Sequence, residues 1–529
     1  MTEEKMVAAP TRTGDLAARP PRTLRSSLPL LAALVLAKLA IHLPLVGRYG
    51  YFRDELYFLD LGRHLDWGYV DCAPLIGVIM KVALLLGGSL PVLRTIAALA
   101  GCGIIVLAVL IARELGGGRF AQALAGLAVM ATPLFLATSS ILTMNVFEPL
   151  FWMGCALVIA RIVRTGDSRL WLVFGVLAGL GLENKHSTLF FGAAVAVAVV
   201  LTPLRRSLAR RWIWLGLGIA ALLFLPNVLW QVAHGFPTIE DLNNVRESGK
   251  NVVLPPLAFI GQQVMIVHPF LAPLWISGLV SLLFGRLRTF RSLGWTYLVV
   301  LGMFMATRGK DYYVAPAYPM LMAAGAVALE GWLGKLAWTR GRVWPRLLVA
   351  AWVITAGALV VPFVTPLLSP AGQVAYRKAI GVQEQKTEVA HDGPLVQIFG
   401  DQFGWEELVA DIARVYNALP PEERAWATIF ASNYGEAGAL HLWGPKYGLP
   451  EAICAHQTHY FWGPGNARGD VVIWLQWERR WIEPMFASVE QAGEHRHEWG
   501  MAEENRPIFV CRGMTRSFAE LWPDLKHWN

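Results

Sequence analysis

The sequence predicts a polytopic α-helical membrane protein with a soluble α/β domain at its C-terminal end. Its 529 residues are 55% hydrophobic and only 16% charged, which is typical of polytopic membrane proteins and rare in soluble domains. Its 22 tryptophans are typical of the aromatic belts at bilayer interfaces. A spanning helix needs about 20 apolar residues, and no run beyond Ser369 is that long.

The net charge is divided unequally between these two parts. The total of +8 combines −7 from Ser369 onward (14 Lys+Arg against 21 Asp+Glu) with +15 in the rest of the chain (32 against 17). The basic residues of the first part lie in short loops between apolar runs, not on one face. This distribution does not predict a protein that binds nucleic acid.

The apolar runs begin after a polar, basic segment. The polar, basic composition of residues 1–27 predicts a disordered cytoplasmic tail. The first apolar run has no small-residue cleavage site, so we expect a retained membrane anchor. About 11 transmembrane helices are predicted, and the fifth and ninth are short. They are Leu28–Val46, Leu90–Ala112, Phe120–Thr138, Val146–Val163, Leu170–Leu182, Ser187–Leu204, Trp212–Val232, Leu257–Phe284, Leu293–Ala306, Val314–Leu333 and Pro345–Val364.

Basic loops separate alternate runs, and the positive-inside rule predicts that these loops are cytoplasmic. They hold Arg113 and Arg119; Arg161, Arg164 and Arg169; Arg205, Arg206, Arg210 and Arg211; Arg286, Arg288 and Arg291; and Lys335, Arg340, Arg342 and Arg346. The external side then carries Tyr49–Leu75, Ser139–Asn145, Glu183–His186, His234–Pro256, Arg308–Tyr313 and the C-terminal part. We therefore predict a transmembrane domain at 28–366 and an external domain at 367–529.

The external domain shows short β-rich pieces alternating with helical pieces, which predicts an α/β fold. The expected strands are Leu395–Phe399, Ala427–Ala431, Val471–Leu475 and Ile508–Cys511, and the expected helices are Trp405–Leu419, Glu436–Trp443 and Pro484–Ala492. No Gly-rich nucleotide loop is present. The five cysteines show no metal-ligand spacing, so no structural zinc site is predicted. Cys454 and Cys511 are open to two interpretations: a disulfide in an oxidising compartment, or two unpaired buried thiols.

Charge is concentrated in the first external segment, Tyr49–Leu75, where Asp54 and Glu55 stand together. A short interfacial helix is expected from Asp54 to about His64, with Leu56, Tyr57 and Leu59 on the lipid side. The two acids have three interpretations: a helix cap, partners of Arg53 or Arg63, or a partly buried general base. Asp60, Asp66 and Asp71 are expected to be solvated or structural.

Other polar residues at membrane depth also have two interpretations each. Glu148 can face the same cavity as Asp54 or complement a helix start before Pro149. Lys185, in the polar segment Glu183–His186, can extend to the interface or bind a phosphate. Arg308 and Lys310 form a second external cationic cluster, and with Lys185 they would suit a phosphate headgroup. His268 is expected to be a satisfied buried histidine, and the alternative is a metal ligand.

Four motifs occur in an order that resembles membrane glycosyltransferases of the GT-C type. They are the Asp54-Glu55 pair with Gly68-Tyr69-Val70-Asp71 and Pro74-Leu75; the stretch from Met144 to Trp152 with Asn145 and Glu148; Gly179-Leu180-Gly181-Leu182-Glu183-Asn184-Lys185; and Lys310-Asp311-Tyr312-Tyr313 with Pro316, Tyr318 and Pro319. The likeness covers about residues 30 to 335. It is greatest to the dolichyl-phosphate-mannose protein mannosyltransferases and the lipid A aminoarabinose transferase. The chain departs from their pattern at Ala73-Pro74, where two prolines are frequent, and at Glu148, where Asp is usual.

The resemblance implies a GT-C fold in a bacterial inner (plasma) membrane, with a cytoplasmic N-terminus, a catalytic first external loop at 47–89 and a periplasmic C-terminal domain. Such enzymes move a sugar, with inversion, from a polyprenyl-phosphate donor to a hydroxyl of a lipid, glycan or protein acceptor. By resemblance Asp54 would take the acceptor proton, which agrees with the need for a base opposite the leaving group. No metal ligand is assigned, although the resemblance allows a divalent metal.

The implied site residues fall into three groups. The catalytic group is Asp54, Glu55 and Glu148; the donor-phosphate group is Lys185, Arg308, Lys310, Tyr312 and Tyr313; the acceptor or sugar pocket is Tyr69, Asp71, Asn145 and His186. A secondary transporter is the alternative, because it too would place acids and lysines at membrane depth. The chain shows no internal repeat of the transporter kind.

Overall fold

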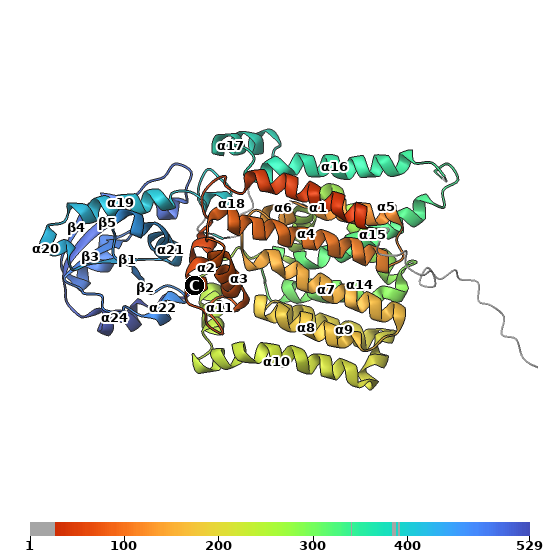
Figure 1. Ribbon diagram of the computed structural model, residues 1–529, viewed down its shortest axis with the longest axis horizontal. Helices are drawn as coiled ribbons and strands as arrows, with labels where there is room; N and C mark the ends of the chain where they lie inside the picture. The colour runs from red at the N-terminus through yellow and green to blue at the C-terminus, as the bar shows by residue number, and fades with distance from the viewer. Residues whose placement is uncertain (1–26, 340, 383–387, 390–391) are drawn as a thin grey trace, which may run out of the picture.

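The computed structural model describes residues 27–339, 341–382, 388–389 and 392–529. The tail predicted at residues 1–27 therefore lies outside the described residues except for Ser27, and so does Arg340. Figure 1 shows a bundle of long helices with the C-terminal domain at one of its ends. The last residues of the chain return to the bundle, where Lys250 Nζ donates to the Asn529 carbonyl at 3.0 Å.

Among the described residues, six helical segments are long and apolar enough to cross a membrane, or eight if two bent pairs each count as one span. The six are α1 with η3 (Leu28–Leu45), α4 (Leu90–Glu114), α7 (Met144–Thr165), α10 (Arg211–Ala233), η7 with α15 (Asp311–Leu333) and α16 (Trp344–Val364). The bent pairs are α9 (Thr188–Leu201) with η4 (Pro203–Ala209), and α12 (Pro256–Val267) with η5 and α13 (Pro269–Leu283). Each of the 11 apolar runs predicted to span the membrane contains helix. The lengths of these helices support six to eight spans and do not confirm 11.

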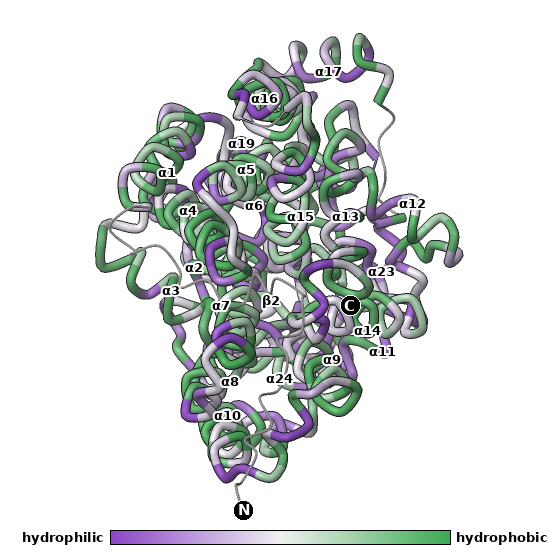
Figure 2. Tube along the Cα trace, turned by 90° about the vertical axis from the view of Figure 1, so that its right-hand side faces the viewer, coloured by the Kyte–Doolittle hydropathy of each residue, from purple (hydrophilic) through white to green (hydrophobic). Residues whose placement is uncertain are grey.

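The bundle also contains shorter helices, several of which lie outside the predicted apolar runs. They are α2 (Arg53–Arg63), α3 (Leu75–Leu85), α5 (Arg119–Met130), α6 (Pro133–Thr138), α8 (Leu170–Asn184), α11 (Pro237–Glu247), η6 (Arg288–Phe290) and α14 (Arg291–Ala306). Figure 2 shows hydrophobic residues along the outlying helices of the bundle, including α1 and α10. On α10 large apolar side chains such as Leu217, Leu222 and Leu229 are exposed, as expected for a surface that faces lipid.

Proline breaks two of the runs that were predicted as single spans. Phe120–Thr138 is divided into α5 and α6 before Pro133, and Leu257–Phe284 bends by 92° at Pro269. Proline lacks the N–H of the helical ladder and disfavours helix at the residue before it. At the second break, His268 Nδ1 accepts from the Phe270 N–H at 3.1 Å, and its Nε2 lies 3.1 Å from the Ala356 carbonyl. The buried, satisfied histidine is thus confirmed.

Helix α2 lies between the bundle and the C-terminal domain (Figure 1). The expectation that Leu56, Tyr57 and Leu59 face lipid is wrong, because all three are buried at 1% exposure or less. Leu56 belongs to the core of the C-terminal domain, whereas Tyr57 and Leu59 pack among residues of α3 and α4. The helix is covered on both sides by protein, so its apolar residues do not mark a membrane face.

The C-terminal domain is built on a mixed five-stranded sheet with the order β2-β1-β3-β5-β4. Strands β2, β1 and β3 are parallel, and β5 is antiparallel to both β3 and β4. The strands are β1 (Ala427–Ala431), β2 (Ile453–Cys454), β3 (Val471–Leu475), β4 (Phe486–Glu494) and β5 (Pro507–Met514). The helices are α17 (Pro370–Ala379), α18 (Gln397–Gly400), α19 (Trp405–Ala418), α20 (Pro421–Arg424), α21 (Tyr434–Trp443), η8 (Gly444–Tyr447), α22 (His459–Trp462), α23 (Arg479–Ile482), η9 (Glu483–Met485), η10 (Ala502–Glu504) and α24 (Phe518–Leu525).

Helices cover both faces of this sheet (Figure 1). Ile429 and Ile473 pack with α19 and α21 on one face, whereas Phe430 and Trp474 pack with α24 on the other. The central strands are therefore continuous apolar runs, which made β1 and β3 predictable from sequence.

Two predicted pieces of the domain are wrong in type. Leu395–Phe399, expected as a strand, overlaps helix α18, and Pro484–Ala492, expected as a helix, lies mostly in strand β4. Strand β4 pairs with β5 alone and buries Phe486 and Val489, whose spacing of three resembles a helical stripe. All five cysteines are unpaired, and β1 and β3 separate Cys454 from Cys511.

Candidate active site

The candidate site lies where the first turn of α2 meets the C-terminal domain. The Phe52 N–H donates to Glu55 Oε2 at 2.9 Å and thereby fixes the start of the helix. Asp54 lies in this first turn, where the helix dipole favours an acid. Its Oδ1 accepts a hydrogen bond of 3.1 Å from the hydroxyl of Tyr434, the first residue of α21. Asp54 is thus held from both domains.

The surroundings of Asp54 suit a carboxylate that accepts a proton. Burial raises the pKa of Asp54 above its usual value, and the neighbouring Arg53 charge and the Tyr434 hydrogen bond partly oppose this rise. A raised pKa makes the ionised carboxylate a stronger base. The desolvation and the specific partners together are typical of a functional group.

Arg53 is held on the side of the C-terminal domain by three acids. Its guanidinium nitrogens lie 2.9 Å from Glu503 Oε1, 3.7 Å from Glu388 Oε2 and 4.0 Å from Asp401 Oδ2. Glu388 also pairs with Lys310 Nζ at 3.3 Å. Although burial opposes it, Lys310 and Arg53 lower the pKa of Glu388 to about 2. Burial raises the pKa of Asp401 to about 7, despite the Arg53 charge.

A second polar cluster surrounds Lys185 at the end of α8. Its ammonium donates to Asn145 Oδ1 at 2.8 Å and to Glu148 Oε2 at 3.2 Å. It also lies 4.3 Å from the centre of the Tyr313 ring and 5.9 Å from that of Tyr312. Glu148 is only 3% exposed and accepts a further bond from Ser187. The two tyrosines follow Lys310 and Asp311 in the chain, and Lys310 pairs with Glu388 beside Arg53, so segment 310–313 connects this cluster with the one around Asp54.

Other predicted site residues have local partners of their own. Glu55 is fully buried, accepts from the Leu142 N–H at 2.8 Å and lies 3.6 Å from Arg94 Nη2. Asp71 accepts from the Tyr57 hydroxyl at 2.8 Å, and its burial beside Asp241 raises its pKa to about 7.

Three more predicted residues lie apart from Asp54. The Tyr69 side chain is buried, and its hydroxyl donates to the Leu61 carbonyl at 3.2 Å. His186 Nε2 lies 3.0 Å from Asn227 Oδ1. Arg308 is exposed with a φ of 55°, and we find no hydrogen bond or ion pair to its side chain in the described part of the chain. The structure thus connects the Asp54 region with Lys310 through Arg53 and Glu388, and it places Tyr312 and Tyr313 against Lys185. Asn145 and Glu148 join this second cluster through Lys185, and Arg308 lies outside both.

Sequence reasoning missed the contribution of the C-terminal domain. Tyr434 begins α21 just beyond the short turn that follows β1, where Asn433 caps the helix by accepting from the Glu436 N–H at 3.0 Å. Thr458 and His459 likewise lie in the segment that follows the carboxyl end of β2. Functional residues of open α/β sheets collect at the carboxyl ends of parallel strands. Applied to the predicted strands, that rule could have indicated that residues after β1 take part in the site.

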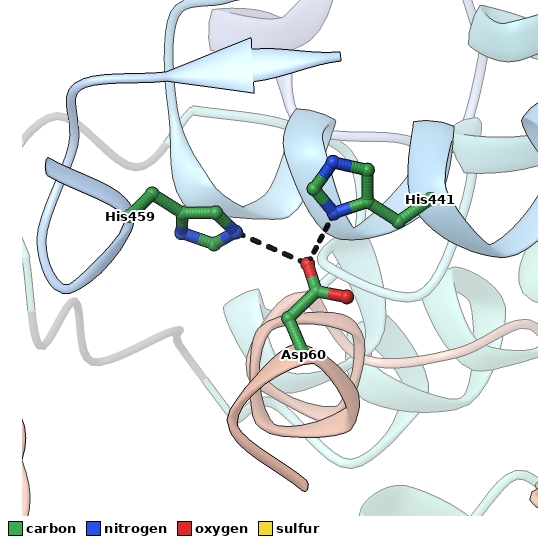
Figure 3. Close-up of side chains that lie close together, drawn as sticks. All are labelled: Asp60, His441 and His459. Atoms are coloured by element: carbon green, nitrogen blue, oxygen red, sulfur yellow. Dashed lines mark hydrogen bonds and ion pairs between the residues drawn. The ribbon is translucent and has the colours of Figure 1, made fainter. Parts of the chain in front are cut away.

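Asp60 was expected to be solvated or structural, and the structure excludes the first of these. It is fully buried and therefore not solvated. Its Oδ2 lies 2.7 Å from His441 Nδ1 and 3.1 Å from His459 Nε2, and Arg63 donates to its Oδ1 at 2.6 Å. Figure 3 shows the two imidazole rings of the C-terminal domain directed at this carboxylate on α2. Separations of 381 and 399 residues hid the group from sequence reasoning.

Comparisons with known proteins show which proteins the chain is similar to. The sequence profile of the dolichyl-phosphate-mannose-protein mannosyltransferases matches residues 71–230. The lipid A galacturonosyltransferase RgtD of Rhizobium johnstonii is 26% identical over 356 residues, which cover 64% of this chain and 72% of that protein.

Solved structures show the same architecture. The crystal structure of ArnT from Cupriavidus metallidurans bound to undecaprenyl phosphate superposes with a TM-score of 0.57 at 15% identity, covering 92% of this chain and 98% of that one. The apo oligosaccharyltransferase of Archaeoglobus fulgidus superposes with a TM-score of 0.50 at 13% identity, covering 81% and 65%. These likenesses establish the fold, and the predicted GT-C fold with a small C-terminal sheet domain is confirmed. The chain is a multi-pass membrane protein.

Proposed function

We propose that this membrane glycosyltransferase of the GT-C type moves a sugar from a polyprenyl-phosphate donor to an acceptor hydroxyl, with Asp54 as the general base. One observation carries the proposal: a partly buried carboxylate with a raised pKa is held by Tyr434 beside Lys310 and Tyr312. A base next to cationic and hydroxyl groups is what the attack of a hydroxyl on a sugar phosphate requires.

In the proposed reaction, Asp54 takes the proton of the acceptor hydroxyl as the acceptor oxygen bonds to the anomeric carbon. The bond from that carbon to the phosphate oxygen breaks on the opposite face, so the configuration inverts. The leaving lipid phosphate keeps the electron pair. Lys310 and Lys185 neutralise its charge, and the hydroxyls of Tyr312 and Tyr313 can donate to it.

Two acids of the predicted catalytic group have positioning roles in this proposal. Glu148 holds Lys185 through the 3.2 Å contact and balances its charge until the donor phosphate arrives. Glu55 joins α2 to the Leu142 backbone and to Arg94, which in turn donates to the carbonyls of Arg48 and Gly50 at 2.6 Å. These bonds fix the loop that presents Asp54.

The donor and acceptor classes follow from the relatives. One relative is a lipid A galacturonosyltransferase, and one solved structure holds undecaprenyl phosphate. We infer a polyprenyl-phosphate-linked sugar as donor and a lipid such as lipid A as the first acceptor to test. A cell inner membrane, with the N-terminus cytoplasmic and the C-terminal domain periplasmic, fits the basic loops and a site that adjoins that domain. The relatives compared above are glycosyltransferases, so the transporter alternative is set aside.

The test compares Asp54→Asn with Asp66→Asn, an exposed acid of the same loop. Both proteins are reconstituted with lipid A and polyprenyl phosphates carrying galacturonic acid, aminoarabinose or mannose. We expect wild type and Asp66→Asn to transfer one of these sugars and Asp54→Asn to lose at least about 10²-fold in rate. Equal rates for the two variants would refute the proposed base.

A further inference from the structure

We propose that Asp60, His441 and His459 form a binding site for one divalent transition-metal ion that clamps the C-terminal domain onto α2. One carboxylate oxygen and two imidazole nitrogens, one from each residue, lie within 4.8 Å of one another. The residues come from three elements, α2, α21 and α22, and their side chains converge on one point (Figure 3). This site is separate from the cluster around Asp54.

The donor set selects the class of metal. Two imidazoles and one carboxylate suit Zn²⁺ and similar ions, whereas Mg²⁺ and Ca²⁺ prefer oxygen ligands alone. Tetrahedral ligands at ~2.1 Å from zinc lie ~3.4 Å from each other. The present distances from Asp60 Oδ2 to the two ring nitrogens are 2.7 and 3.1 Å. Side-chain shifts of about 0.3 Å for His459 and about 0.7 Å for His441 relative to Asp60 would therefore bring these two separations to the value for zinc.

The surroundings orient the ligands. His441 Nε2 lies 2.9 Å from the Ala452 carbonyl, which requires a proton on Nε2. Nδ1 donates to Asp60 in the metal-free protein, and a metal ion that displaced this proton would meet a lone pair already directed at Asp60. Arg63 donates to Asp60 Oδ1 at 2.6 Å and so leaves Oδ2 for a metal. The His459 ring packs against Trp462 with centroids 4.5 Å apart. Outer hydrogen-bond partners like those of His441 and Asp60 accompany metal-binding histidines and carboxylates, whereas His459 Nδ1 has no such partner among the described residues.

The position of the site indicates a clamp and not a reaction centre. Asp60 follows Asp54 by six residues on α2, which is ~9 Å along the helix axis and about 240° around it. His441 likewise follows Tyr434 by seven residues on α21. The two helices run in the same direction. Tyr434 contacts Asp54 at the start of both helices, and His441 contacts Asp60 farther along them. A metal ion bound at His441 and Asp60 would fix the position of α21 along α2, and this position keeps Tyr434 in contact with Asp54.

The close approach of the two helices makes this register sensitive. A Cβ on Gly438 of α21 would lie 2.6 Å from the Leu56 backbone carbon. The backbones therefore touch between the two pairs, and a shift of α21 along α2 would move Tyr434 away from Asp54. A metal ion bonded to both helices would resist that shift more strongly than hydrogen bonds alone.

The test measures metal content in the purified full-length protein in detergent. After dialysis, mass spectrometry of the metals should give about one zinc per chain for wild type. After removal by a chelator, added Co²⁺ should restore about one equivalent with the visible absorption of a four-coordinate site. His441→Ala and His459→Ala should each retain less than about a tenth of an equivalent.

His495→Ala is the matched control, because His495 is buried in the same domain and lies 2.8 Å from an Asp411 oxygen, with no third metal ligand beside them in the described part of the chain. It should bind metal like the wild type. Zn²⁺ added to stripped protein should raise the melting temperature of wild type and His495→Ala but not of the more conservative site variants Asp60→Asn and His459→Gln. A stripped wild type that stays folded and takes up neither ion would overturn the proposal. Equal uptake by wild type and the site variants would also overturn it, because it would show adventitious binding. Neither readout depends on sugar transfer, so the site can fail while the proposed function stands.

Discussion

Replacing Tyr434 with Phe should move the acid limb of the pH–rate profile upward. The Tyr434 hydroxyl donates to Asp54 Oδ1 at 3.1 Å and lowers the pKa of that carboxyl, whereas burial raises it. A hydrogen bond to a charged group contributes about 1.5–3 kcal/mol, and 1.36 kcal/mol corresponds to one pKa unit. Loss of the hydroxyl should therefore raise the pKa of Asp54, and the acid limb of the rate profile should move upward by about 1 to 2 pH units. A base works only when ionised, so the variant should lose activity at a higher pH as the solution is acidified.

The assay measures transfer rates at saturating donor and acceptor across the pH range for wild type, Tyr434→Phe and Tyr416→Phe. The Phe ring keeps the packing of Tyr434 against His456, where the ring centroids are 5.0 Å apart. Tyr416 is the control, because its hydroxyl donates to the Arg424 carbonyl within the same domain and away from Asp54. Above the acid limb Tyr434→Phe should approach the wild-type rate. An acid limb that stays in place or moves downward would refute the assignment of Asp54 as the titrating base.

Three further perturbations test other parts of the structure. Gly438→Ala should lower the melting temperature, because the new methyl group meets the Leu56 backbone at 2.6 Å and overpacking costs about 1–3 kcal/mol; an unchanged melting temperature would contradict the close packing of α2 and α21. Asp401→Asn should flatten the pH dependence of stability. Its folded pKa of about 7 exceeds the unfolded value, so the stability present at low pH is lost as pH rises through 7, by about 1.4 kcal/mol between about pH 6 and pH 8; thermal melts of wild type and variant that decline equally would count against the raised pKa. Lys185→Gln combined with Glu148→Gln should lower kcat/KM for the donor by about 10²-fold, because the leaving phosphate loses one cation; steady-state kinetics within a few-fold of wild type would exclude Lys185 from the donor site.

The sequence predicted well where a pattern is local. Apolar runs located the membrane helices, and continuous apolar strands located β1 and β3, because both signals come from neighbouring residues. Asp54 was singled out for a similar reason, since it stands in a segment with unusual charge for a membrane edge. Strand β4 failed because an edge strand with Phe486 and Val489 buried resembles a helical stripe.

The partners of Asp54 were beyond the reach of local patterns. Tyr434 lies 380 residues away along the chain, and only the packing of α21 on α2 brings the two together. The same packing buries Leu56, which was expected to face lipid, and Asp60, which was expected to be solvated or structural. Glu388 and Lys310 are likewise joined across 78 residues. The site is a product of the interface between the two domains, and a single sequence does not report that interface.

The most direct test of the account is the single-turnover rate of Asp54→Asn with donor already bound. Donor affinity and the chemical step are measured separately, by binding of a labelled polyprenyl-phosphate sugar and by rapid mixing with acceptor. Loss of a general base should slow the chemical step by about 10²–10⁴-fold and leave donor affinity close to wild type. A chemical step within a few-fold of wild type would contradict the central role of Asp54.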